Sequence, residues 1–265
     1  MKTVDVHHWP QRALCQLSLA MLLVVLGPLA SLAFAQGGPP LITDDPGTPG
    51  NRNWEINTAF TFERTPGATA MEAPLLDINY GLGDHMQLKY EGAFLILDEK
   101  DAGPRGTLSN SLVGVKWRFL DENKHGVAVS TYPQVEFNNP GLNASRHGLV
   151  DDGIQVLVPF EIARSFGPWE VGAEVGYSFI QYDDDEWKYG VALGYAVNQR
   201  LQLLAEIAGV VDADFHRNDP ILNLGLRYEL NDHLTLLFAV GRSLRSSLTE
   251  DEPSLLVYSG LSFTF

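Results

Sequence analysis

The sequence predicts an all-β protein, a 12-stranded antiparallel transmembrane β-barrel, from three observations. Twelve segments of about ten residues alternate apolar and polar side chains, as barrel strands do when one face meets lipid and the other the lumen. Short connections alternate with longer ones along the chain. Aromatic residues gather near both ends of the segments on the apolar face, as at the two interfaces of a bilayer.

Composition narrows the alternatives. The chain has 265 residues, of which 45% are hydrophobic and 19% charged, so general disorder is excluded and one large domain is possible. Its single long apolar run lies near the start, whereas a polytopic helical membrane protein needs several spans of about 20 apolar residues. Any interpretation as a membrane-spanning protein therefore requires strands.

Residues 1–35 have the features of a secretory signal peptide. Lys2 and Arg12 give a basic start, residues 17–32 are mostly apolar, and the exit Ala33-Phe34-Ala35 has the small-x-small pattern. We expect cleavage after Ala35 and export of the mature chain. The alternative is a retained single-span anchor, for which the apolar run is short.

The mature chain is acidic and has no cysteine. The single cysteine, Cys15, lies in the expected signal peptide, so neither a disulfide nor thiol chemistry is expected after cleavage. Without Lys2, Arg12 and Asp5, the 18 basic and 33 acidic residues of the whole chain become 16 and 32, a formal charge of −16. This balance argues against a nucleic-acid partner, which requires a basic surface.

A Pro- and Gly-rich segment, residues 36–52, precedes the first strand and is expected at the periplasmic mouth; we call it the lead segment. Within it, Asp44 and Asp45 stand beside Pro46 and Gly47. This composition favours a rigid turn. The alternative is a site for a divalent cation, since carboxylates are hard oxygen ligands. The barrel itself is expected over residues 53–265.

The twelve expected strands follow in order, each an alternating run bounded by turn residues. Pro133 and Pro159 fall inside the fifth and sixth runs, and each removes a ladder donor, so the sequence supports these two strands least. The expected ranges are 54–63, 72–82, 86–97, 109–120, 127–138, 154–164, 169–180, 186–197, 201–211, 221–230, 234–244 and 255–265.

The connections predict the topology. Those after the even-numbered strands are short, namely 83–85, 121–126, 165–168, 198–200 and 231–233. The others are usually longer and richer in acidic residues, Gly or Pro. Short periplasmic turns and longer outer loops are typical of outer-membrane barrels, and an even strand number places both termini in the periplasm.

Alternation also separates a lipid face from a lumen face. In the run 221–230, leucine and tyrosine occupy one face, and Asn223, Gly225, Arg227 and Glu229 the other. Aromatic residues of the apolar face form two girdles. We expect one near the periplasmic strand ends at Trp54, Tyr80, Trp117, Phe119, Trp169, Tyr195, Tyr228, Phe263 and Phe265, and one near the outer ends at Phe60, Phe62, Phe94, Phe137, Phe179 and Trp187.

Two motifs resemble those of known bacterial barrels. The chain ends in Tyr258-Ser259-Gly260-Leu261-Ser262-Phe263-Thr264-Phe265, which resembles the terminal assembly signal of outer-membrane barrels, with Phe263 and Phe265 as its aromatic residues. Residues 40–50, Pro-Leu-Ile-Thr-Asp-Asp-Pro-Gly-Thr-Pro-Gly, with Trp54-Glu55-Ile56-Asn57 after them, resemble the start of the barrel family named for a meta-pathway of phenol degradation.

The resemblance extends over the mature chain. It implies a transporter in the outer membrane of a Gram-negative envelope, inserted by the barrel assembly machinery. The family name suggests aromatic compounds as one substrate class. The resemblance supplies no catalytic or ligand residue for this chain.

Residues suited to catalysis or metal binding are not grouped in the sequence. The histidines of the mature chain, His85, His125, His147, His216 and His233, fall in turns and loops and not beside a strand serine. No histidine pair has ligand spacing, and no cysteine remains. We therefore expect no enzyme, no metal and no cofactor, and keep a loop-histidine hydrolase of envelope lipid as an alternative.

Acidic clusters in the expected outer loops have two interpretations. They are either solvated or recruit divalent cations that bridge lipopolysaccharide phosphates. The clusters are Asp151-Asp152, Asp183-Asp184-Asp185-Glu186 and Glu250-Asp251-Glu252.

Function is expected on the lumen face, which is acidic and therefore favours cations over anions. By alternation, the inward acidic residues are Glu55, Glu63, Asp77, Glu91, Glu136, Glu161, Glu170, Glu174, Glu206 and Glu229, and the inward basic residues are Lys89, Lys116, Arg118, Lys188 and Arg227. Side chains fill a barrel of about eight strands, and roughly 16 to 18 strands enclose a channel, so twelve strands allow either an open path or a filled lumen.

We predict a channel or facilitator for small solutes, in contact with outer-membrane lipids and lipopolysaccharide. The alternative is a plugged barrel that acts as a hydrolase of envelope lipid or has a structural or adhesive role.

Overall fold

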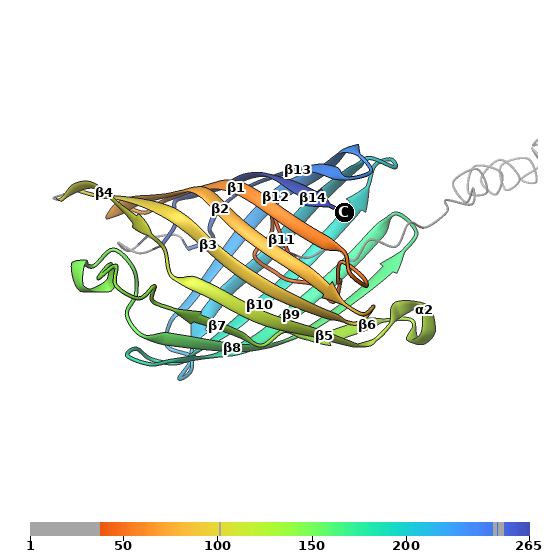
Figure 1. The fold of residues 1–265 in the computed structure, drawn as a ribbon, viewed down its shortest axis with the longest axis horizontal. Coiled ribbons are helices and arrows are strands. Elements are labelled where there is room, and N and C mark those ends of the chain that lie inside the picture. The colour runs from red at the N-terminus through yellow and green to blue at the C-terminus, as the bar shows by residue number, and fades with distance from the viewer. Residues whose placement is uncertain (1–37, 101, 246–247, 249–251) are drawn as a thin grey trace, which may run out of the picture. The chain divides into compact units, whose positions relative to one another are not determined.

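The computed structural model describes residues 38–100, 102–245, 248 and 252–265. The expected signal peptide with Cys15 lies outside these residues, as do Glu250 and Asp251 of one acidic cluster. In the described part, antiparallel strands form one sheet that closes on itself as a barrel of tilted strands (Figure 1). The predicted fold class, a 12-stranded antiparallel β-barrel, is confirmed.

The wall is built from fourteen strand segments. They are β1 (Trp54–Arg64), β2 (Ala68–Leu82), β3 (Met86–Glu99), β4 (Gly103–Leu108), β5 (Ser111–Leu120), β6 (Ala128–Thr131), β7 (Gln134–Phe137), β8 (Ile154–Phe166), β9 (Trp169–Ile180), β10 (Glu186–Ala196), β11 (Leu201–Asp212), β12 (Asn218–Asn231), β13 (Leu234–Ser243) and β14 (Leu255–Thr264). A short helix, α2 (Glu122–His125), and a 3-10 turn, η1 (Ser145–His147), lie in connections. Pairing of β1 with β14 closes the barrel.

Two of the twelve strands are interrupted. β4 and β5 both pair with β3 and are separated at Ser109 and Asn110. β6 and β7 both lie between β5 and β8 and are separated at Tyr132 and Pro133. Proline has no backbone N–H, so the ladder stops there. By contrast, Pro159 lies within β8, which stays continuous.

The observed bounds follow the predicted ranges closely, with two differences. β2 begins at Ala68, earlier than predicted, because a bulge between Glu72 and Leu75 carries the ladder past Pro74. The sequence analysis does not predict β4, whose Gly- and Pro-containing sequence lacks clear alternation, and β4 extends the hairpin with β3.

The outer wall is apolar, and the inner wall is polar. On β9, Val175 and Phe179 expose about half of their surface, at 49% and 52%, while Glu174 and Ser178 are buried. Aromatic rings pair near the short-turn end, as Trp169 and Tyr195 do at 4.6 Å between centroids. An apolar band with aromatic ends fits a bilayer. In the described part of the chain, no helix is long and apolar enough to span a membrane.

Polar side chains fill the centre of the barrel. Those that are at most 2% exposed include Asn57, Asp77, Lys116, Glu161 and Glu206. Buried apolar residues form one small cluster within the described residues, made of Leu41, Ala192 and Leu204. Burying a charge is costly unless it is paired, so the partners of these groups define the site.

Candidate functional site

The lead segment lies inside the barrel. Its described part begins at Gly38 and contacts the inner faces of β12, β11, β10, β9 and β5 in turn. The sequence analysis expects residues 36–52 at the periplasmic mouth, and in the structure the last residues of this segment lie at the short turns. Thr48 Oγ1, for example, donates to the carbonyl oxygen of Asp84 in the β2–β3 turn at 3.0 Å. Residues 38–45 extend into the lumen, where charged side chains of the wall bind them.

Two buried carboxylates hold the segment by its backbone amides. Ile42 N and Thr43 N donate to the two carboxylate oxygens of Glu206 at 2.7 and 2.8 Å. Asp44 N donates to Glu174 Oε2 at 2.8 Å. A hydrogen bond to a charged group contributes about 1.5–3 kcal/mol net, so these three bonds form a strong anchor.

A buried lysine forms a second anchor. Lys116 Nζ on β5 donates to Asp44 Oδ1 at 2.8 Å and to the carbonyl oxygen of Asp45. It also lies 3.7 Å from Glu161 Oε2 and 4.5 Å from the centre of the Tyr132 ring. Because Lys116 is only 2% exposed, these groups balance its charge in place of water.

Gly190 on the inner wall leaves space for the lead segment because it has no side chain. A Cβ at Gly190 would lie 3.0 Å from the Cβ of Thr43 and would collide with the threonine hydroxyl. Next to this contact, Leu41 packs with Ala192 and Leu204 on β10 and β11. The segment is therefore fitted to the wall by shape as well as by charge.

Arg227 on β12 binds the start of the described segment. Its Nη2 donates to the carbonyl oxygens of Gly38 and Pro39 at 3.0 and 2.6 Å. Arg227 thus supplies donors to carbonyl groups, while Glu206 and Glu174 supply acceptors to amides. The wall binds the main chain of the segment through both kinds of group.

The two aspartates of the segment form a turn. Asp45 N donates to Asp44 Oδ1 at 2.8 Å, and Gly47 N donates to Asp45 Oδ1. Asp44 also binds Lys116, as described above. Three or more metal-binding side chains do not come together anywhere in the described residues.

A second buried network lies on β1, β2 and β3. Lys89 Nζ pairs with Asp77 Oδ1 at 3.3 Å and with Glu91 Oε2 at 2.8 Å. Asn57 and Asn79 donate to the Asp77 carboxylate at 3.1 and 3.0 Å. In the circular order of the strands, β1, β2 and β3 lie across the barrel from β9, which carries Glu174. These side chains therefore fill the other side of the lumen.

The other predicted lumen residues divide between the two ends. Lys188 Nζ on β10 pairs with Glu174 Oε1 at 2.9 Å. Arg118 lies at the short-turn end and donates to Asp121 at 3.1 Å. The rest are at most partly exposed; Glu55, Glu170 and Glu229 lie near the short-turn end, and Glu63 and Glu136 near the opposite end.

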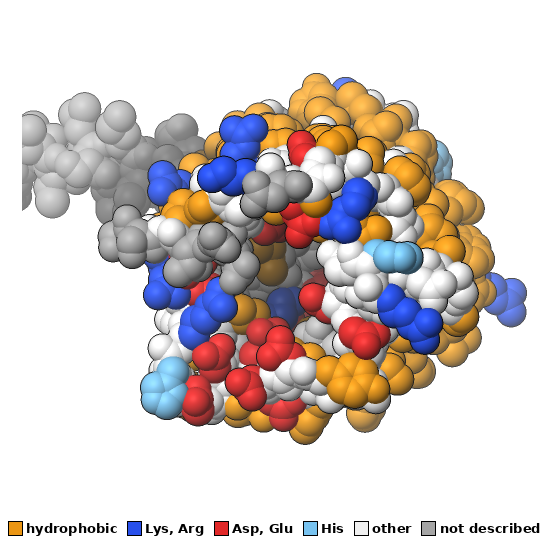
Figure 2. Space-filling model, turned by 90° about the vertical axis from the view of Figure 1, so that its left-hand side faces the viewer, with side chains coloured by type: hydrophobic (Ala, Val, Ile, Leu, Met, Phe, Trp, Pro, Cys, Tyr) orange, Lys and Arg blue, Asp and Glu red, His pale blue; other side chains and the backbone are white. Residues whose placement is uncertain are grey.

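The half of the lumen away from the short turns contains a cavity of about 590 Å³. Pro40, Leu41 and Ile42 of the lead segment line it, together with residues from β1, β2 and β10 to β14. Figure 2 views this end and shows a hollow mouth with acidic and basic side chains around it, and with apolar and basic surface deeper inside. The lead segment therefore separates this cavity from the short-turn end.

An ion-pair network closes one side of the mouth. Arg217 Nε pairs with Asp219 Oδ2 at 2.7 Å. Arg245 Nη1 lies 2.7 Å from Asp219 Oδ1 and 2.8 Å from Glu252 Oε1. The basic side chains of this network therefore have acidic partners.

The histidines lie where the sequence analysis places them, in turns and loops. His85 and His216 each contact an aspartate, at 3.3 and 2.6 Å, and His233 Nδ1 lies 2.8 Å from the carbonyl oxygen of Thr264. The hydrogen bond with Asp214 raises the pKa of His216. No hydrogen bond joins a histidine to a serine or threonine hydroxyl in the described residues.

The predicted lumen residues are all charged and leave out the neutral members of the site, although the sequence analysis places one of them, Asn223, on the polar face. Tyr132 supports Lys116, Asn223 donates to Glu206 Oε1 at 2.7 Å, and Gln87 donates to the Tyr132 hydroxyl at 3.2 Å. All three share the inward face with the predicted charges, so extending the alternation to uncharged side chains would have included them in the site.

Comparisons with known proteins agree with this geometry. The family model described as "Putative MetA-pathway of phenol degradation" matches residues 72–265. The COG4313 outer membrane channel from Pseudomonas putida F1 has a similar structure, with a TM-score of 0.65 at 11% identity, covering 87% of this chain and 100% of that one. A NanC porin has a TM-score of 0.59 at 11% identity, covering 78% and 98%.

A KdgM porin has a TM-score of 0.53 at 10% identity and covers 79% of this chain and 99% of that one. At these identities the solved structures show a shared fold. No curated protein sequence matches the chain. The family match covers most of the sequence, and the chain belongs to the barrel family named for the MetA pathway of phenol degradation.

Proposed function

We propose that this protein is an outer-membrane channel for small solutes, in which the lead segment controls the path through the lumen. One observation carries the proposal: Glu206 and Glu174, inward-facing acids of the wall, bind the backbone amides of residues 42–44. Carboxylates that hold a chain segment in this way become available to solute and water when the segment leaves.

The expected processing supports a movable segment. With cleavage after Ala35, the mature chain begins at Gln36, and the lead segment is joined to the barrel only where it enters β1. Its anchors are hydrogen bonds, ion pairs and a small apolar cluster. A segment held at one end by the chain and elsewhere by such contacts can leave the lumen without unfolding the wall.

The similar structures support the channel interpretation, because their descriptions name an outer-membrane channel and porins. One KdgM porin structure is described as a complex with disordered oligogalacturonate, a polyanion. The mouth of the present barrel carries Glu63, Glu72 and Glu136, so we expect it to prefer cations.

A hydrolase is less well supported. A nucleophile needs a base within hydrogen-bond reach and a third group that orients the base. His85 and His216 have an aspartate, but their rings lie in exposed connections without a neighbouring hydroxyl nucleophile in the described residues. We therefore assign the chain no reaction.

The channel proposal predicts cation selectivity that depends on the mouth acids. In a planar bilayer with a KCl gradient, the refolded mature protein should give a reversal potential of the sign expected for cation preference. Glu63→Gln with Glu136→Gln should move this potential toward zero, because two negative charges leave the mouth.

Glu99→Gln with Arg105→Gln is the matched control, since these two side chains pair with each other and their joint removal leaves the net charge, and therefore the potential, near that of the unmodified protein. A correctly folded barrel without current, or with anion preference, contradicts the proposal. Heat-modifiable migration in gels establishes the folded state of each variant.

A further inference from the structure

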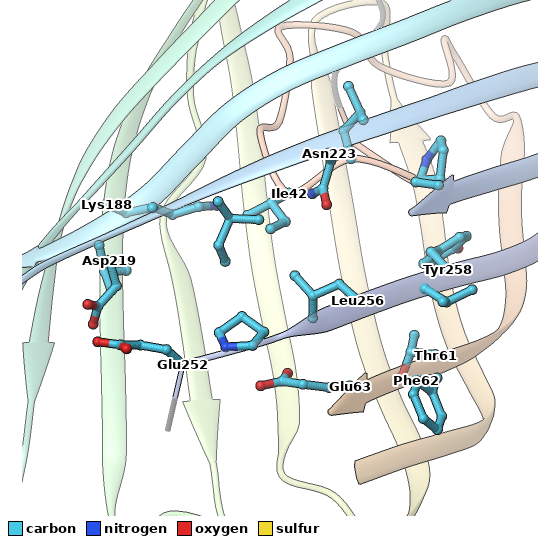
Figure 3. A pocket seen from close by; sticks show the side chains of 18 of the residues that line it. Ile42, Thr61, Phe62, Glu63, Lys188, Asp219, Asn223, Glu252, Leu256 and Tyr258 are labelled. Atoms are coloured by element: carbon cyan, nitrogen blue, oxygen red, sulfur yellow. The ribbon is translucent and has the colours of Figure 1, made fainter. Parts of the chain in front are cut away.

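The cavity above the lead segment combines an apolar surface with four acidic side chains, of which Asp219 and Glu252 belong to the ion-pair network of the mouth. Leu41, Ile42 and Leu256 line it together with Glu63 and Glu72. In Figure 3, Ile42 lies on one side of the cavity, with Leu256 and Glu63 on the other. A pocket of 300–1,000 Å³ with apolar walls and a few polar groups is typical of small-molecule sites, and about 590 Å³ falls in this range.

The strand register explains this arrangement. Glu63 on β1 is directly opposite Leu256 on β14, and Thr61 is opposite Tyr258. Side chains of opposed residues lie on the same face of a sheet, so a carboxylate, an isobutyl group, a hydroxyl and a phenol project together into the lumen. On the other side of β1, Thr61 is opposite Glu72 and donates to its Oε2 at 2.9 Å.

The basic side chains that line the cavity form ion pairs, whereas two of its acidic side chains do not. Lys188 is paired with Glu174, and Arg217 with Asp219. No ion pair joins Glu63 or Glu72 to a basic side chain in the described residues. The lining therefore offers two carboxylates as acceptors, whereas its cations already have partners.

A further polar atom is present at the same wall. The Tyr258 hydroxyl is buried and has no hydrogen-bond partner in the described part of the chain. The Tyr258 side chain as a whole is partly exposed and lines the cavity, so its ring adds an aromatic surface beside the carboxylates. The unpartnered hydroxyl is an observation independent of the carboxylates.

We propose that this cavity binds small organic cations, in which an ammonium group meets Glu63 and Glu72 and an apolar body lies on Leu41, Ile42 and Leu256. This inference rests on the proposed function and names its solute class. The lead segment supplies part of the apolar surface, so solute binding and the position of the segment are linked.

The test compares three molecules that share one rigid apolar body and differ in the head group. They are 1-adamantylammonium, 1-adamantanol and adamantane-1-carboxylate. Isothermal titration with the mature barrel in lipid nanodiscs gives the dissociation constants, and empty nanodiscs correct for partition into lipid. The measurement needs no current, so it is independent of whether the barrel conducts.

We expect the ammonium compound to bind about tenfold more tightly than the alcohol, as an added charge-assisted contact of about 1.4 kcal/mol would give. Glu63→Gln with Glu72→Gln should abolish that difference. Asp183→Asn, which removes an exposed charge at the same end but outside the cavity lining, should preserve it. This pattern supports the site.

Equal binding of all three molecules, preference for the carboxylate, or no binding overturns the inference. So does an equal loss of ammonium binding in Asp183→Asn, because the effect would then come from the overall negative charge of this end. If the ammonium binds as expected and the barrel carries no current, the site stands and the channel proposal fails.

Discussion

Removal of residues 38–48 increases the single-channel conductance of the refolded barrel, by roughly threefold or more, because the segment then no longer crosses the lumen and its volume becomes available to water and ions. The deletion keeps Gly50, which contacts the backbone at Gly81, so the start of β1 retains its support. Planar-bilayer recording of the full mature chain and the deletion variant measures the effect.

A second variant tests whether the effect comes from the lost side-chain contacts or from the removal of the segment itself. Replacement of residues 40–46 by a glycine-serine sequence of equal length removes Leu41, Asp44 and Asp45 but keeps the tether. This variant should also increase the conductance, but its single-channel current should vary more between openings than that of the deletion variant, because the tether can still enter the lumen. If both variants fold and conduct like the unmodified chain, the lead segment does not control the path.

Replacement of Lys116 by methionine destabilises the barrel and releases the lead segment. Glu161, which is 1% exposed, keeps the Ser130 hydroxyl at 2.5 Å but loses its nearby cation, and Asp44 loses its ion pair. Breaking a buried ion pair from one side costs about 3–5 kcal/mol. The midpoint of urea unfolding in liposomes should fall, and conductance should increase.

Lys124→Met is the control for this change. The Lys124 side chain is 68% exposed and pairs with Asp121 in the short turn. An exposed pair contributes about 0–1 kcal/mol, so its loss should leave both the midpoint and the current nearly unchanged. An equal effect of the two substitutions would show that Lys116 is not an anchor.

The barrel could be predicted from the sequence because its two determinants are local. Alternation of side chains fixed the faces of β9 and β12, and aromatic residues such as Trp169 and Tyr195 marked the strand ends. The sequence analysis gave the strands with Pro133 and Pro159 the least support, and of these two only the one with Pro133 is interrupted. The bulge at Glu72 and the strand β4 were not predicted, because they depend on pairing with neighbours.

The site was predicted only in part. Alternation placed Lys116, Glu174 and Glu206 on the inner face, but it contains no information on what they bind. They bind the lead segment, largely through its backbone groups. The amides that Glu206 and Glu174 bind lie 130 or more positions away from these glutamates in the chain. Contacts with main-chain amides leave no side-chain pattern in the sequence, so the segment was expected outside the lumen.

The central claim is that the lead segment closes the path while it stays in the lumen, and a reversible lock tests it most directly. Leu41→Cys with Ala192→Cys brings two thiols together, since Leu41 of the lead segment and Ala192 of β10 pack in the same buried cluster and neither position excludes a side chain. After removal of the signal peptide these would be the only thiols in the chain.

Current through single barrels should be recorded before and after addition of a reductant, with each single-cysteine variant as a control. The account predicts that the oxidised protein makes no transitions to larger conductance and that reduction restores them. Transitions that occur equally in the oxidised and reduced protein would contradict it.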